Sequence, residues 1–141
     1  MKRNTINSIE GSCLCGAVLF KAVNQFSQFH FCHCKQCQKT SGSAHAANLF
    51  IDADQFSWIT GENLIVRFDV PGRAISSVFC RQCGCPCPYL SKTGKAMVVP
   101  AGALDQLPDL YPQDNIFWSE RAAWYDQGLR SHKVALFPRT G

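Results

Sequence analysis

The sequence predicts a mainly β protein of small, twisted antiparallel sheets with one or two short helices. Short segments rich in β-branched and aromatic residues recur along the 141-residue chain, and turn residues separate them. Helical periodicity is scarce, and nine cysteines gather in closely spaced groups of the kind that hold metal ions. The chain has the length of one domain, so we expect a single zinc-binding domain over residues 1–141, with a core from about 9 to 138.

Five segments have the β-branched and aromatic composition of strands. They are Val18–Ala22, Ala47–Ile51, Leu64–Asp69, Ala74–Phe79 and Ala96–Val99. Three segments between them carry Gly, Pro or Asn where a chain reverses, namely Thr60–Asn63, Val70–Arg73 and Ser91–Lys95. Hairpins and a meander are therefore expected.

The clearest helical segment is Lys35–Ser41, which Gly42 ends as a C-cap. A single turn is expected at Glu120–Trp124. The segment Asp105–Asn115 contains two prolines among acidic and amide residues, so it is interpreted as a surface loop.

The composition predicts a soluble, cytoplasmic protein. No stretch approaches the roughly 20 apolar residues of a membrane span, and Met1–Glu10 lacks the apolar run of a secretory signal. An odd number of cysteines in a chain that is not exported favours metal binding over disulfides, because a reducing cytosol keeps thiols free.

The formal charge of +4 does not indicate a nucleic-acid partner. Metal-bound cysteines are thiolates, so a Zn²⁺ held by four of them carries −2 and one held by three carries −1, which lowers the total to about +1. The lysines and arginines are scattered, and the longest basic run, Lys2-Arg3, is a terminus.

Seven of the cysteines fall into three clusters. These are Cys13-Leu14-Cys15-Gly16, Cys32-His33-Cys34-Lys35-Gln36-Cys37 and Cys80-Arg81-Gln82-Cys83-Gly84. Thiolates one to three positions apart chelate a single ion, and Zn²⁺ accepts the tetrahedral arrangement that pairs of them make. Each cluster alone is a weak signal, and together they predict two zinc ions.

The pair Cys80 and Cys83, followed by Gly84, resembles half of a zinc-ribbon knuckle, in which glycine lets backbone amides face the sulfurs. A knuckle supplies only two ligands. The remaining pair, Cys13 and Cys15, completes a closed, structural site of four cysteines.

The middle cluster keeps Cys32, Cys34 and Cys37. Three protein ligands with an open fourth position are typical of a catalytic zinc. The alternative is closure of the site by His33 or His30.

The same residues resemble those of the glutathione-dependent formaldehyde-activating enzymes, a family that shares its domain with centromere protein V. The resemblance covers nearly the whole chain. Its motifs are Gly11-Ser12-Cys13-Leu14-Cys15-Gly16-Ala17-Val18, Cys32-His33-Cys34-Lys35-Gln36-Cys37-Gln38-Lys39 and Phe79-Cys80-Arg81-Gln82-Cys83-Gly84, with a weaker match at Ile116-Phe117-Trp118 and Trp124.

The resemblance implies a tent-like all-β fold, a structural zinc at Cys13, Cys15, Cys80 and Cys83, and a catalytic zinc at Cys32, Cys34 and Cys37. Because the catalytic site has few protein ligands, we expect its zinc to be the more labile of the two. The resemblance also implies a carbon-sulfur lyase whose namesake reaction joins formaldehyde to the thiol of glutathione as S-hydroxymethylglutathione. The sequence departs from the family pattern at Cys85 and Cys87, which follow the knuckle.

The open zinc would act as a template that holds nucleophile and electrophile together. Glutathione is acidic, so its carboxylates need cationic partners. The candidates are Lys35, Lys39, Arg73, Arg81 and Arg121.

Other residues have both a structural and a functional interpretation. His33 is a proton shuttle or a hydrogen-bonding turn residue, and His45 is expected to be structural. Cys85 and Cys87 alternate along an expected strand, so burial as small hydrophobes is favoured over metal binding. The three tryptophans are expected in the core or in a pocket wall, namely Trp58, Trp118 and Trp124.

Two further hypotheses concern the whole chain. One is a non-catalytic two-zinc module that binds protein or nucleic acid. The other is a structural protein whose middle site is closed by a side chain or by a second subunit, in a homo-oligomer.

Overall fold

The computed structural model describes residues 8–138, so the basic pair Lys2-Arg3 lies outside the described residues. Most of the elements are short strands, and two short helices and four 3-10 turns stand between or after them. The strands are β1 (Ser8–Ser12), β2 (Leu19–Val23), β3 (Gln28–Cys32), β4 (Ala46–Asp52), β5 (Phe56–Thr60), β6 (Ile65–Asp69), β7 (Ser76–Cys80), β8 (Tyr89–Leu90), β9 (Ala96–Pro100) and β10 (Asp114–Ile116). The helices are α1 (Lys35–Ser41) and α2 (Tyr125–Leu129), with 3-10 turns η1 (Ala53–Gln55), η2 (Glu62–Leu64), η3 (Ala101–Ala103) and η4 (Trp118–Glu120).

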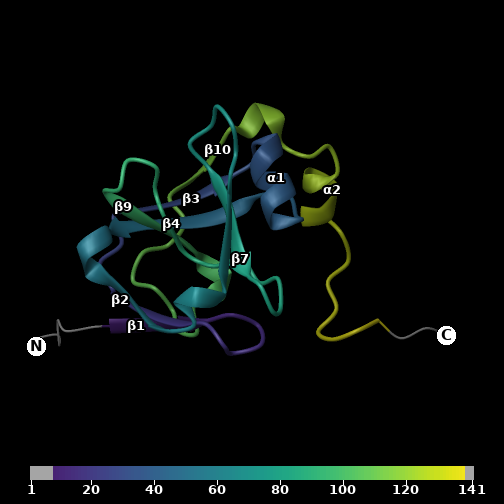
Figure 1. Ribbon diagram of the computed structural model, residues 1–141. Coiled ribbons are helices and arrows are strands. Elements are labelled where there is room, and N and C mark those ends of the chain that lie inside the picture. Colours follow the sequence, from purple (N-terminus) through teal and green to yellow (C-terminus); the bar gives the residue numbers. More distant parts are fainter. Residues whose placement is uncertain (1–7, 139–141) are drawn as a thin grey trace, which may run out of the picture.

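These strands form three small sheets, which confirms the mainly β fold class. One sheet has the order β1-β2-β5, the second has the order β10-β3-β4-β9-β8, and β6 pairs only with β7. Figure 1 shows β7 running across the direction of β4, with both short helices on the same side of the sheets. Two of the expected turns close antiparallel hairpins, Val70–Arg73 between β6 and β7 and Ser91–Lys95 between β8 and β9. The third, Thr60–Asn63, instead connects β5 to β6, which lie in different sheets. Strands β1 and β2 also pair antiparallel, as do β3 and β4, which α1 separates in sequence.

The five-stranded sheet differs from the expectation at one edge. Strand β10 pairs in parallel with β3, with Asp114 opposite His30 and Ile116 opposite Cys32. The interpretation of Asp105–Asn115 as a surface loop is therefore wrong at its C-terminal end. The pairing partner lies about 84 residues away in sequence, so local composition could not reveal it.

Helix α1 has the predicted bounds. Gly42 ends it in the left-handed conformation, with φ of 64°, and its N–H donates to the carbonyl of Gln38. The turn expected at Glu120–Trp124 lies between η4, which ends at Glu120, and α2, whose N-cap is Trp124. None of the described helices has the length and apolar character needed to cross a membrane.

The main core lies between the first two sheets. Phe20 of β2, Leu49 of β4 and Val99 of β9 are completely buried in it, and Trp58 of β5 packs against its margin. Burial of such side chains from long-range strand pairs provides most of the stabilisation of the sheets. This core supports the edge of the sheet from which the cysteine-rich segment after β3 emerges.

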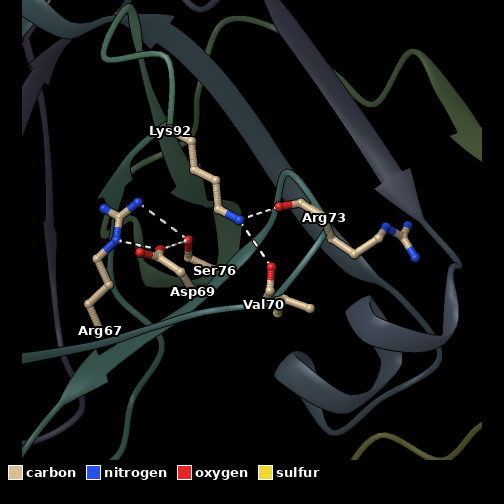
Figure 2. Close-up of polar contacts among 6 residues, drawn as sticks. All are labelled: Arg67, Asp69, Val70, Arg73, Ser76 and Lys92. Atoms are coloured by element: carbon tan, nitrogen blue, oxygen red, sulfur yellow. Dashed lines mark hydrogen bonds and ion pairs between the residues drawn. The ribbon is translucent and has the colours of Figure 1, made fainter.

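The β6–β7 hairpin is attached to its surroundings by side chains at its tip. The Lys92 ammonium donates to the carbonyl oxygens of Val70 and Arg73, while Asp69 accepts from Arg67 and Ser76 within the hairpin (Figure 2). The side chain of Arg73 extends the other way, toward α1, where its guanidinium donates to the side-chain oxygen of Gln36 at 2.7 Å. The hairpin is thus held close to the cysteine-rich helix.

Candidate metal centres and the adjoining cavity

The fold brings together the two cysteine pairs from opposite parts of the sequence. The sulfur atoms of Cys13, Cys15, Cys80 and Cys83 all lie within 4.8 Å of one another. The first pair follows β1, and the second begins at the end of β7. The four cysteines that the sequence predicts for one closed site therefore lie together in the structure.

The local backbone of this group is arranged for thiolates. The N–H groups of Val18 and Gln82 each donate to a sulfur at 3.3 Å, of Cys13 and Cys80 respectively. Gly84 has φ of 77°, so it takes the left-handed turn that a knuckle requires. Partial burial opposes ionisation of Cys83, but hydrogen bonds with the backbone of Cys85 and Cys15 lower its pKa to about 6.

The second group consists of Cys32, Cys34 and Cys37, whose sulfurs also lie within 4.8 Å of one another. Cys32 ends β3, Cys34 is the N-cap of α1, and Cys37 lies in the first turn of the helix. The N–H of Cys37 donates to the sulfur of Cys34 at 3.3 Å. All three side chains are buried, and Ile75 and Ile116 pack around them.

Cys32 and Cys37 share a proton unequally. A hydrogen bond with Cys37 lowers the pKa of Cys32 to about 6, and the same bond raises the pKa of Cys37. The thiolate of Cys32 therefore forms readily, while Cys37 holds its proton until a cation compensates the charge. Metal binding here should release protons.

Both donor sets fit zinc. A Zn–S bond of about 2.3 Å in a tetrahedron places neighbouring sulfurs ~3.8 Å apart. The distance from Cys13 to Cys15 is 3.6 Å and that from Cys15 to Cys80 is 4.0 Å, between sulfurs. Four thiols suit a closed site, and three leave one position for another ligand.

Neither of the two candidate histidines belongs to the three-cysteine group among the described residues. His30 contacts the carboxylate of Asp114 and the amide of Gln28. His33 is fully buried, and its Nε2 lies 2.9 Å from the side-chain oxygen of Asn115. Closure of the site by either residue finds no support in this arrangement.

The His33 ring instead packs among aromatic side chains. Its centroid lies about 5 Å from those of His45, Trp118 and Tyr125. Burial lowers the pKa of His45, which also stacks on Phe31 at 4.2 Å. These contacts are consistent with a structural role for His45.

The C-terminal segment secures the cysteine-bearing helix. Glu120 accepts a hydrogen bond from the backbone N–H of Lys35, the first residue of α1, at 3.0 Å. The Gln38 side chain donates to the carbonyls of both His33 and Glu120. No local pattern indicates the role of Glu120, because the contact spans 85 positions.

A cavity of about 280 Å³ adjoins the three-cysteine group at Cys37. It lies between α1, the wall formed by β4 and η3, and the hairpin strand β7. Its lining includes no charged side chain among the described residues. The residues around it are Cys37, Thr40, Ser41, Ala46, Ala47, Asn48, Ile75, Ser76, Ser77, Val78, Cys85, Pro86, Cys87, Tyr89, Pro100, Ala101, Gly102 and Ala103.

A second hollow, of about 440 Å³, shares Thr40 and Ser77 with this cavity. Two cations, Lys35 and Lys39, line it together with the exposed Phe68. A ligand that occupies both spaces would have anionic groups beside the lysines and an uncharged part near Cys37. We call the cavity at Cys37 the inner cavity, and the hollow lined by the two lysines the lysine groove.

The other cationic candidates lie in different settings. Arg73 is engaged with Gln36, and Arg121 forms an ion pair with Asp126 and stacks over the ring of Trp118 at 4.3 Å. Arg81 lies at an exposed position between Cys80 and Cys83 of the knuckle and lines neither space.

The remaining predictions have mixed outcomes. Cys87 is buried and Cys85 packs beside it, outside both candidate metal groups, as expected for small hydrophobes. They do not lie in a regular strand, however, because only the intervening Pro86 forms a bridge. Of the three tryptophans expected in the core or in a pocket wall, Trp58 packs against the core, whereas Trp118 and Trp124 are 40% and 58% exposed and are not core residues.

Comparison with known proteins gives three findings. A family model described as glutathione-dependent formaldehyde-activating enzyme matches residues 8–120. A curated protein of Halomonas elongata whose name refers to the same enzyme is 48% identical over 48 residues, which are 33% of this chain and 31% of that protein. The chain thus matches about a third of that relative's length.

The third finding concerns the fold. A crystal structure of a Rhodobacter sphaeroides protein superposes with a TM-score of 0.60 and 20% sequence identity, covering 76% of this chain and 99% of that one. At this identity the similarity is one of fold alone.

Proposed function

The chain belongs to the glutathione-dependent formaldehyde-activating enzyme family, and we propose that it is a zinc-dependent carbon-sulfur lyase acting on the adduct of a thiol and an aldehyde. Glutathione and formaldehyde, which give S-hydroxymethylglutathione, are the reference substrates for this proposal. The observation that carries it is the group of three sulfurs from Cys32, Cys34 and Cys37 beside the inner cavity. Three protein ligands at a substrate-sized space are typical of a working metal site.

In the proposed roles, Cys32, Cys34 and Cys37 hold the catalytic zinc, and Cys13, Cys15, Cys80 and Cys83 hold the structural one. A zinc ion at the first group would supply an open coordination position that holds thiol and aldehyde together. The protein contributes the burial that excludes water from this position and the helix α1 that orients it.

The lysine groove supports an acidic thiol as the substrate. Lys35 and Lys39 lie on successive turns of α1, the same helix that carries Cys37. Carboxylates bound by charge-assisted contacts to these lysines would leave the thiol directed toward the inner cavity. Proximity of thiol and carbonyl is then the main source of acceleration.

The reaction is an addition that needs no oxidant. The thiol sulfur forms a bond with the carbonyl carbon, and the thiol proton ends on the carbonyl oxygen. In the lyase direction the same carbon-sulfur bond breaks and the proton returns to sulfur.

The first test is the zinc content of freshly purified wild type and of a Cys32→Ser, Cys37→Ser double variant, with formaldehyde and glutathione turnover assayed on the same samples. The proposal expects two zinc ions per chain in the wild type and one in the double variant. The variant should keep the circular dichroism spectrum of the wild type and should have no turnover. One zinc in both proteins, or two with no turnover on any thiol, would favour a structural or binding role.

We also propose a cytoplasmic location, because nine free cysteines suit a reducing compartment. Cell fractionation with an antibody to the protein tests this, and recovery from an oxidising compartment would contradict it.

A further inference from the structure

The inner cavity has a size that formaldehyde does not explain. Formaldehyde has two non-hydrogen atoms and occupies roughly the space of one or two water molecules, ~30 Å³ each. The cavity measures about 280 Å³. Small side chains on its β4 and η3 walls, including Ala47, Ala101 and Gly102, leave this space open.

Several polar side chains of the wall already make hydrogen bonds within the protein. The hydroxyls of Thr40 and Ser41 donate to the carbonyl of Cys37, and that of Ser76 donates to Asp69. The Cys87 thiol donates to the carbonyl of Cys85. With these groups satisfied, most of the wall behaves as an apolar surface, to which the two cysteines contribute as small hydrophobes.

The wall formed by the hairpin is held in place. Lys92 ties the tip of the hairpin to the turn before β9, and Asp69 fixes both Arg67 and Ser76 (Figure 2). Arg73 joins the same tip to α1 through Gln36. A space bounded by secured elements on both sides remains available before a ligand arrives, which favours binding because little ordering is needed.

The charges divide the site into two unlike halves. Among the described residues, cations line the lysine groove and none lines the inner cavity. The carboxylates of an acidic thiol therefore belong in the groove, since a carboxylate in the cavity would lack a partner. The cavity is left for the other component of the adduct.

We propose that the inner cavity binds the apolar group of an aldehyde larger than formaldehyde, and that the natural adduct is the hemithioacetal of an acidic thiol and an uncharged aliphatic or aromatic aldehyde. This inference rests on the proposed function. A group of roughly four to seven carbons would fit, at ~30 Å³ for each small group. The chemistry is the same addition, in which sulfur bonds to the carbonyl carbon and the thiol proton moves to oxygen.

The test uses stable adduct mimics with the full chain in its zinc-loaded form. Calorimetry compares the affinities of S-methylglutathione and S-hexylglutathione, and turnover with glutathione compares formaldehyde, pentanal and benzaldehyde. Because each buried methylene favours binding, the hexyl compound should bind at least about tenfold more tightly than the methyl compound. Pentanal or benzaldehyde should have a higher kcat/KM than formaldehyde.

Two variants fill the cavity from different elements. Ala101→Leu, on η3, and Ser77→Leu, on β7, should each bring the hexyl-to-methyl affinity ratio close to one. Ala53→Leu is the matched control, because Ala53 is also half-buried but does not line the cavity. It should retain the wild-type ratio.

Equal affinities for the two mimics, or a ratio that neither filling variant changes, would overturn the inference. If formaldehyde turnover persists in that case, the proposed function still stands. Absence of turnover with every aldehyde tested would instead contradict both the proposed function and this inference.

Discussion

The carboxylate of Glu120 accepts a hydrogen bond from the backbone N–H of Lys35 at 3.0 Å, although 85 positions separate the two residues. Lys35 begins α1, so Glu120 satisfies a helix-terminal N–H that has no partner within the helix. The interaction connects the C-terminal segment to the helix that carries Cys37. It makes the three-cysteine group depend on a distant part of the chain.

Removal of this contact should loosen the three-cysteine site. Glu120→Ala is expected to lower the free energy of unfolding by about 1 kcal/mol, as for the loss of a capping side chain. It should also raise the rate at which a chelator removes the more labile zinc. Urea unfolding and a chelator-release assay measure the two effects. Glu120→Gln, which keeps an acceptor oxygen, should lie closer to wild type; an equal loss in both variants would contradict the hydrogen-bond explanation.

The four-cysteine site should be essential for folding. Binding of structural zinc contributes about 10–16 kcal/mol, comparable to the whole stability of a domain, about 5–15 kcal/mol. Cys80→Ser should therefore be largely unfolded by circular dichroism. Cys85→Ser is the matched control, because Cys85 lies outside both candidate groups, and it should fold with both metals bound. A folded Cys80→Ser protein would show that the site is dispensable.

Asp69 should contribute to stability in a pH-dependent way. Hydrogen bonds with Ser76 and then Arg67 lower the pKa of its carboxyl. Because the folded-state pKa lies below the unfolded one, this stabilisation is complete above the unfolded value, about 3.9, and is lost as the pH falls through the folded-state pKa.

The corresponding variant is Asp69→Asn. Compared with wild type, this variant should have a lower free energy of unfolding. The difference should be constant from about pH 6 to 8 and should become smaller below about pH 4. Urea titrations at several pH values measure it, with Asp52→Asn as an exposed control. A deficit that grows on acidification would contradict the assignment.

Lys92 should restrain the tip of the β6–β7 hairpin. Its ammonium donates to the carbonyls of Val70 and Arg73 (Figure 2). Lys92→Met should speed amide hydrogen exchange about tenfold or more around residues 70–75, because it removes two charge-assisted hydrogen bonds, and should leave β4 unchanged. Lys95→Met, in the same turn, is the control. Unchanged exchange at the tip would mean that other contacts hold the hairpin.

Lys39 should assist binding of an acidic thiol. Loss of a charge-assisted contact is expected to raise the KM for glutathione about tenfold in Lys39→Gln, with little change in kcat, because the contact forms equally in the ground and transition states. Steady-state kinetics at low and high salt test this. Lys21→Gln removes an exposed lysine of β2 far from the groove and should behave as wild type. A fall in kcat without a change in KM would assign Lys39 another role.

Local sequence signals accounted for the β6–β7 hairpin, for the turn before β9 and for α1. The turn residues at Val70–Arg73 and the C-capping Gly42 act over a few positions, so their effects are readable from composition. Strands β1, β3, β5 and β8 were not predicted. Each is short, and its stability comes from neighbours in the sheet rather than from its own propensity. The parallel pairing of β10 depended on a partner that no local pattern identifies.

The spacing of the cysteines by itself determined which sulfurs act together, because a chelate of one ion constrains residues one to three positions apart and the left-over pairs must then combine. The tertiary structure decided what surrounds them. It placed the carboxylate of Glu120 at the N-terminus of α1, packed the His33 ring among aromatic side chains, and opened an uncharged cavity at Cys37 beside the cationic groove. Such features arise from packing between segments distant in sequence, where burial and charge depend on all the neighbours at once.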